Sequence, residues 1–170
     1  MLIEMKVAGI TMDPLSNTPI VILKEVNGTR ALPIWIGILE ASAIATQLGD
    51  VTPPRPMTHD LIKNVFTDLN ITLTSIEVTD LKDNTFFATI HLSMSNKKIS
   101  VDARPSDAIA LALRNNSPIF VNEDVVVKSR GIDLKHDESD EKGTKGHDDD
   151  PNWTEILENL SPEDFGKYKM

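Results

Sequence analysis

Two short polar segments of the sequence contain most of the side chains that could perform chemistry. In the first, residues 55–60, Arg55, His59 and Asp60 offer a phosphate ligand, a general acid or base, and a metal ligand. The same segment also suits the start of a helix, because Thr58 is a favourable N-cap and Asp60 in the first turn would complement the helix dipole. Residue types and spacing leave both interpretations open.

The second polar segment, residues 102–107, lies between a predicted strand and a predicted helix. Asp102, Arg104 and Asp107 could bind a metal or a phosphate there. A structural interpretation again exists, because Pro105 suits the first helical position and Asp107 could accept hydrogen bonds from backbone donors of the first turn. Function and helix capping therefore compete at this segment as well.

The two halves of the sequence resemble each other over a short stretch. At an offset of 67 residues, the run 40–45 aligns with the run 107–112, and both are rich in alanine. Each run begins with an acidic residue, Glu40 or Asp107. An acidic residue near the start of each helix would compensate the helix dipole, and this alone would explain the match. We therefore expect a repeated unit of one strand followed by one helix.

The repeat also bears on the second polar segment. Trp35 stands where Asp102 does in the other half, and Gly37 stands where Arg104 does. Because the same architecture tolerates an apolar and a small residue at these positions, the fold does not require Asp102 and Arg104. The comparison favours a functional role for both.

Hydrophobic patterning predicts six short strands and three helices around these segments. The second helix has one apolar face, whereas the third is apolar nearly all round and should be buried, with only its ends in solvent. Asn27-Gly28 predicts a two-residue hairpin turn, and a further turn is expected at 82–84. The expected fold class is α+β, with two related halves sharing one curved, mixed sheet covered by helices. The predicted strands are 3–7, 19–26, 29–36, 73–78, 86–92 and 98–101, and the predicted helices are 38–48, 58–69 and 106–114.

Composition limits the class of protein. The chain has 170 residues, no cysteine and no apolar run of about 18 residues, so neither disulfides nor a membrane-spanning helix is expected. Its first residues do not resemble a secretory signal, and we expect a soluble, cytoplasmic protein. Residues 1–130 are predicted to form one domain, 131–152 an acidic flexible linker, and 153–170 a short amphipathic helical tail. The tail would dock on the body or on a second subunit, or bind a protein partner.

The net charge of −9 is concentrated in the C-terminal region. Residues 1–130 contain 12 basic and 14 acidic side chains, whereas residues 131–170 contain 5 and 12. A body so close to neutral argues against a broad basic face for nucleic acid. Any contact with phosphate groups should therefore be local or carried by a metal ion.

The sequence also contains three distinctive runs. They are Pro-Ile-Trp-Ile-Gly at 33–37 with Glu40-Ala41, Arg-Pro-Met-Thr-His-Asp at 55–60, and a run over 102–114 that begins Asp-Ala-Arg-Pro-Ser-Asp. Together these runs resemble the bifunctional nuclease domain family, over about residues 3–128, and the C-terminal residues resemble the tails of bacterial members. The resemblance implies a single barrel-like sheet of two β3α2 repeats, with nuclease activity on RNA and DNA. The positions that match the polar motif are Glu40, Arg55, His59, Asp60, Asp102, Arg104, Ser106 and Asp107.

One hypothesis that combines the residues with the resemblance is a metal-assisted nuclease. Mg²⁺ or Mn²⁺ would polarise the scissile phosphate and activate the attacking water. His59 would act as general acid or base, and Arg104 or Arg55 would neutralise charge in the transition state. Arg55 and Ser106 would contact the nucleic acid. The candidate catalytic residues are His59, Asp60, Asp102, Arg104 and Asp107, and the candidate metal ligands are Glu40, Asp60, Asp102 and Asp107.

The alternative hypothesis is a non-enzymatic, oligomeric binding or regulatory module. In that case the two polar segments are helix caps and an Arg–carboxylate network that fixes loops between the halves, while the acidic tail recruits a partner. This hypothesis predicts that Asp107→Ala lowers stability by about 1 kcal/mol, the cost of a lost cap, without changing any activity.

Overall fold

The computed structural model describes residues 1–95 and 97–129. All six predicted strands and all three predicted helices are present, and the structure adds a short seventh strand and a helical segment over 123–129 that were not predicted. The predicted linker and C-terminal tail lie outside the described residues, and the boundary of the domain at residue 130 stays a prediction. The elements are β1 Leu2–Met12, β2 Pro19–Glu25, β3 Ala31–Trp35, α1 Ile38–Leu48, α2 Thr58–Asp68, β4 Thr72–Lys82, β5 Thr85–Met94, β6 Lys97–Ala103, α3 Pro105–Asn115 and β7 Ile119–Asn122.

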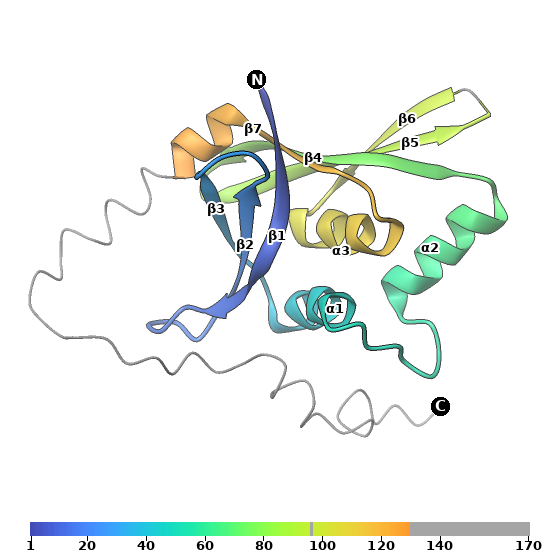
Figure 1. Ribbon diagram of the computed structural model, residues 1–170, viewed down its shortest axis with the longest axis horizontal. Coiled ribbons are helices and arrows are strands. Elements are labelled where there is room, and N and C mark those ends of the chain that lie inside the picture. The colour runs from blue at the N-terminus through green and yellow to red at the C-terminus, as the bar shows by residue number, and fades with distance from the viewer. Residues whose placement is uncertain (96, 130–170) are drawn as a thin grey trace, which may run out of the picture.

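The strands form one mixed sheet in the order β3-β2-β1-β7-β4-β5-β6. Neighbouring strands are antiparallel, except for the parallel pair of β4 and β7. Among the described residues, the edge strands β3 and β6 each pair with one neighbour, so the sheet is open. The predicted barrel-like closure is not confirmed, because β6 pairs only with β5, in a hairpin that projects away from α1 and α3 (Figure 1).

Both halves of the sheet follow the same local order. Strands β1–β3 form an antiparallel meander that leads into α1, and β4–β6 form another that leads into α3. The two helices each have 11 residues and begin 67 positions apart, at Ile38 and Pro105. The offset found in the sequence thus places equivalent residues at the starts of the two helices, while descent of the halves from a duplication stays a prediction.

Helix α3 lies at the centre of the molecule. It packs against α1, α2, β4 and β5, and Ala108, Ile109 and Ala110 are fully buried. Figure 1 shows α3 between the long strand β4 and helix α1. Burial of this helix was predicted from its apolar sequence and is confirmed. Within the described residues, no helix combines the length and apolarity needed to cross a bilayer.

The predicted apolar face of α2 is only half covered. Ile62 and Phe66 pack against the core. Leu61, Val65 and Leu69 remain exposed to solvent. The helix is therefore held by a narrow apolar contact together with polar contacts at its N-terminus.

The two turns predicted from the sequence have different outcomes in the structure. Asn27-Gly28 lies in a wider loop, and the Glu25 amide donates to the Arg30 carbonyl at 2.9 Å. The Arg30 guanidinium also binds the Glu25 carboxylate, which supports this wider loop. The two-residue turn with two positive φ angles is Asp83-Asn84, at 48° and 59°, between β4 and β5. The prediction of a two-residue turn at Asn27-Gly28 was therefore wrong, and the turn predicted at 82–84 is confirmed.

Candidate active site

Four of the predicted residues form one connected polar network, made of Glu40, His59, Arg104 and Asp107. His59 Nε2 lies 3.1 Å from Asp107 Oδ1. Arg104 Nε donates to Asp107 Oδ2 at 2.8 Å, and its Nη1 donates to Glu40 Oε1 at 2.7 Å. Residues separated by as many as 64 positions in the chain thus meet through direct hydrogen bonds.

The network is assembled from the starts of three helices. Glu40 and Asp107 occupy the third helical position of α1 and α3, and Arg104 is the N-cap residue of α3. His59 is the second residue of α2. Because helical side chains lean toward the N-terminus, residues in the first turns of neighbouring helices can reach one another across the gap between their ends.

Capping does not follow the sequence prediction. The N-cap of α2 is Met57 rather than Thr58, and the Asp60 carboxylate accepts a hydrogen bond from the Met57 amide at 2.9 Å. Asp107 directs one oxygen to His59 and the other to Arg104. Its carboxylate therefore joins two helices, whereas a purely local cap would bind only the backbone of α3.

A second, buried ion pair lies beside the network. The Arg114 side chain is 2% exposed, and its Nε donates to Asp60 Oδ1 at 2.6 Å. Its Nη1 donates to the carbonyl oxygens of Ala43 in α1 and Ala110 in α3. Arg114 thereby joins all three helices. It was not predicted as part of the site, although a cation near the end of a buried helix signals the need for a buried counter-ion.

The carboxylates of both ion pairs are stabilised in the charged form. Burial raises the pKa of Asp107, but hydrogen bonds from Arg104 and His59 outweigh burial and hold this pKa below its ordinary value. Burial likewise raises the pKa of Asp60, and hydrogen bonds from Arg114 and the Met57 amide bring it below the ordinary value. Both groups are therefore acceptors at neutral pH.

The ionised Asp107 carboxylate determines which nitrogen of His59 carries the proton when the ring is neutral. A carboxylate can only accept a hydrogen bond, so the His59 nitrogen facing it, Nε2, carries the proton. The other nitrogen, Nδ1, is then unprotonated and can accept a proton. The side chain is 13% exposed, which leaves part of the ring in contact with solvent.

The remaining predicted site residues are not joined to the network. Asp102 is exposed on β6, opposite Thr89 of β5, and Arg55 is exposed in the loop before α2. Ser106 is buried in the first turn of α3 and lines a neighbouring pocket. Among the described residues, Asp102 does not form a metal-binding group with Asp60 and Asp107.

The predicted metal ligands do not form a chelating group. Within residues 1–95 and 97–129, no set of three His, Asp or Glu side chains is arranged to hold an ion. Asp107 and Asp60 already direct both of their oxygens to protein donors, and Glu40 binds Arg104. The carboxylates of Glu40, Asp60 and Asp107 are therefore not arranged to hold a metal ion with protein ligands alone.

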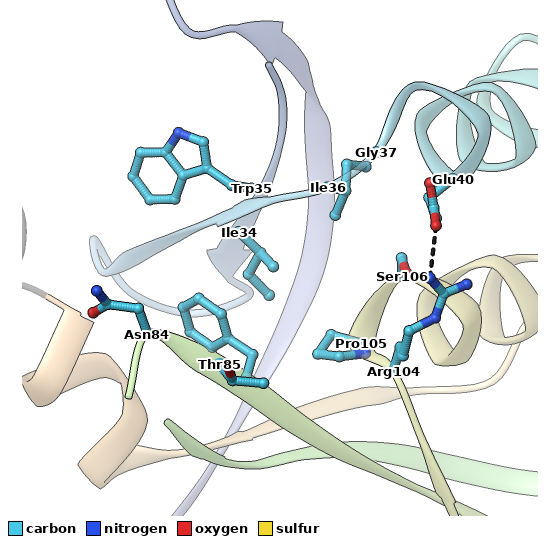
Figure 2. Close-up of a pocket in the computed structure, with 11 residues that line it drawn as sticks. Ile34, Trp35, Ile36, Gly37, Glu40, Asn84, Thr85, Arg104, Pro105 and Ser106 are labelled. Carbon is cyan, nitrogen blue, oxygen red and sulfur yellow. Dashed lines mark hydrogen bonds and ion pairs between the residues drawn. The ribbon is translucent and has the colours of Figure 1, made fainter. Parts of the chain in front are cut away.

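A pocket of about 260 Å³ adjoins the Glu40–Arg104 ion pair. Figure 2 shows Trp35, Ile36 and Gly37 on one side, Pro105 on the other, and Glu40 bound to Arg104 at one end. Asn84 and Thr85 come from the tight β4–β5 turn. The pocket was not predicted, because its walls come from three separate parts of the sequence, 34–40, 84–86 and 104–106.

Comparison with known proteins finds one matching domain family and several proteins of similar sequence. A family model described as the bifunctional nuclease domain matches residues 21–134. An uncharacterized protein of Mycobacterium tuberculosis is 43% identical over 164 residues, which cover 95% of this chain and 97% of that protein. Bifunctional nuclease 2 and bifunctional nuclease 1 of Arabidopsis thaliana are 30% and 29% identical over 107 and 109 residues. These matches cover 61% and 62% of this chain, and 32% and 34% of the plant proteins.

Proposed function

The chain belongs to the bifunctional nuclease domain family, and from that membership we propose that it is a nuclease that hydrolyses phosphodiester bonds of RNA or DNA. The observation that carries the proposal is the contact between His59 and Asp107 at 3.1 Å, in a network that also contains an exposed arginine. An imidazole oriented by a carboxylate is a suitable general base, and a guanidinium is a suitable phosphate ligand.

In the proposed reaction, His59 Nδ1 takes a proton from the water that attacks the phosphorus atom. The bond between phosphorus and the leaving ester oxygen breaks, and the leaving oxygen takes a proton from solvent. Asp107 stabilises the imidazolium that forms on His59, because the carboxylate already accepts the Nε2 proton.

Arg104 would neutralise the charge that develops on the phosphate. Its side chain is 65% exposed, and its Nε and Nη1 are held by Asp107 and Glu40. Its Nη2 has no protein partner among the described residues and can bind a phosphate oxygen. The hydrogen bonds with the two carboxylates raise the pKa of Arg104, so the guanidinium stays charged at any working pH.

Metal assistance by Mg²⁺ or Mn²⁺ stays a prediction. A divalent ion would supply polarisation of the phosphate and activation of water. Because the carboxylates of the network are engaged by protein donors, such an ion would have to be held largely by the substrate.

The test is cleavage of end-labelled single-stranded RNA and DNA by the purified full chain. His59→Ala should lower the rate about 10²- to 10⁴-fold, the usual contribution of a general base. His91→Ala is the matched control, because His91 Nε2 also faces a carboxylate, that of Glu77, at 3.5 Å, but lies in strand β5. Its rate should equal that of the wild type.

Undiminished cleavage by both His59→Ala and Asp107→Asn would show that the activity comes from elsewhere. Each reaction is repeated with a chelator, and again with Mg²⁺ or Mn²⁺ restored. A rate that depends on both His59 and the added ion supports metal assistance. A rate that depends on His59 but not on the added ion supports a nuclease that needs no metal.

A second candidate function is the non-enzymatic binding module. The exposed apolar side chains of Leu61 and Val65 on α2 and of its C-cap Leu69 favour it, since such a face suits contact with another protein or a second copy of the chain. This alternative predicts that Asp107→Ala, which removes the acceptor for His59 and Arg104, loses about 1 kcal/mol of stability with no change in cleavage. Thermal unfolding and hydrolysis measured on this one variant therefore separate the two functions.

A further inference from the structure

The pocket beside the Glu40–Arg104 ion pair has no role in the proposed proton transfer. Its volume of about 260 Å³ lies just below the range of roughly 300 to 1,000 Å³ that is typical of sites for drug-sized ligands. It opens between the end of β3, the β4–β5 turn and the start of α3 (Figure 2). A site of this size can accept one flat ring system but not a base pair.

Trp35 provides a fixed aromatic surface at the pocket. The residue is 38% exposed, and its indole Nε1 donates to Asp13 Oδ2 at 3.2 Å. A tryptophan anchored by its N–H group loses little further freedom when a ligand stacks on its ring. The core does not need this side chain, because neighbouring Ile34 and Ile36 are already buried.

The remaining walls combine apolar and polar groups in the way that a nucleobase requires. Phe86 and Pro105 are apolar lining residues of the pocket. Asn84, the turn residue with φ of 59°, is a polar lining residue. An amide side chain can both donate to and accept from the edge of a base.

The opposite end of the pocket leads to the proposed phosphate ligand. Arg104 lines the pocket, and its free Nη2 is the donor assigned above to a phosphate oxygen. Glu40 and Asp107 outnumber this one guanidinium when His59 is neutral, so charge alone would hold a phosphate weakly. Binding of a neutral ring in the pocket would supply the missing affinity.

We propose that this pocket is a subsite for one unpaired nucleobase, stacked on Trp35 and adjoining the phosphate bound by Arg104. The protein would therefore act on single-stranded nucleic acid, because a base held in a duplex cannot enter the pocket. The choice of ligand rests on the proposed nuclease function.

The test measures binding apart from cleavage. The probe is a single-stranded thymidine tetranucleotide with phosphorothioate linkages that resist hydrolysis, and its partner has the same backbone without bases. Trp35 and Trp153 are the two tryptophans of the chain, so a Trp153→Phe background makes tryptophan emission report on Trp35 alone. The tetranucleotide should quench this emission, and the abasic probe should not.

Affinity is then compared among variants by fluorescence anisotropy of the labelled tetranucleotide. Trp35→Ala should weaken binding roughly 5- to 150-fold, the range for loss of one stacked base. Phe87→Ala is the matched control, because Phe87 is 40% exposed but lies outside the pocket. Trp35→Phe and Trp35→Leu have similar bulk, and only the former should retain most of the affinity.

Equal affinity for the intact and abasic probes, or for wild type and Trp35→Leu, would overturn the subsite. If His59-dependent cleavage persists in that case, the nuclease proposal survives without the pocket. Base-dependent binding without any cleavage would support the nucleobase subsite and refute the nuclease proposal. The two proposals therefore fail in different ways.

Discussion

Removal of the Asp60 carboxylate should leave the buried guanidinium of Arg114 without its counter-ion. The Arg114 side chain is 2% exposed and Asp60 is its carboxylate partner, at 2.6 Å. In Asp60→Ala the cation keeps only its hydrogen bonds to two main-chain carbonyls, those of Ala43 and Ala110. Those carbonyl oxygens carry only partial negative charge and cannot neutralise the full positive charge of Arg114.

The expected loss in the free energy of unfolding is about 4 kcal/mol. An uncompensated buried charge costs roughly 3–5 kcal/mol, and the lost acceptor for the Met57 amide adds about 1 kcal/mol. The two carbonyls recover part of this cost. A loss of this size is a large fraction of the roughly 5–15 kcal/mol that stabilises a typical domain.

Arg114→Met should cost less, about 1–3 kcal/mol. Methionine replaces the aliphatic part of the side chain, and the Ala43 and Ala110 carbonyls lie inside helices, where they can still accept helical amides. Asp60 is 25% exposed, so water can solvate the carboxylate that remains. In the double variant the unpaired cation is absent, and Arg114→Met should partly rescue Asp60→Ala.

The assay is urea unfolding followed by far-UV circular dichroism. The control is Asp80→Ala, because Asp80 is also 25% exposed and also accepts a backbone amide, but its partners Lys82 and Lys128 are 67% and 49% exposed. Each of these exposed pairs should be worth about 1 kcal/mol or less. A double variant less stable than Asp60→Ala, or a loss at Asp60 no larger than at Asp80, would refute the reasoning.

Two further measurements address the carboxylates and the tight turn. Because Asp60 and Asp107 have lowered pKa values in the folded state, the unfolded chain binds protons first as the pH falls. The free energy of unfolding should therefore decrease below about pH 5, less steeply in Asp60→Asn, and equal slopes in the two proteins would contradict this linkage. Asn84→Ala should cost about 1–2 kcal/mol, because alanine is disfavoured at the positive φ that Asn84 shares with Asp83. The same change at Asn27, which has no positive φ, should cost clearly less, and equal costs in thermal unfolding would argue against the assignment of the turn.

Local patterning was sufficient to predict most of the elements. Helix α1 was predicted at its observed ends, and burial of α3 followed from its apolar composition. Strand β7 was missed, since four residues are too short for periodicity to be informative. Its place between β1 and β4 depends on pairing with residues far away in the chain.

Turn geometry could not be predicted from dipeptide preference alone. Asn27-Gly28 has the more favourable sequence for a two-residue turn, yet the loop there is wider. Arg30 binds Glu25 within the loop and Glu123 beyond β7. A contact over 93 positions thus supports a loop conformation that local propensity does not favour.

The sequence by itself determined which residue types are available for chemistry and that they occur at the starts of helices. It also established the family resemblance, since that depends on the order of residues alone. Only the tertiary structure decided how the charged groups pair. Asp60 binds Arg114, and Asp107 is shared by His59 and Arg104, so the expected chelating group of carboxylates is not formed. The physical reason is that a buried charge takes whichever opposite charge packing brings within hydrogen-bond distance, and packing joins helices that are distant in the chain.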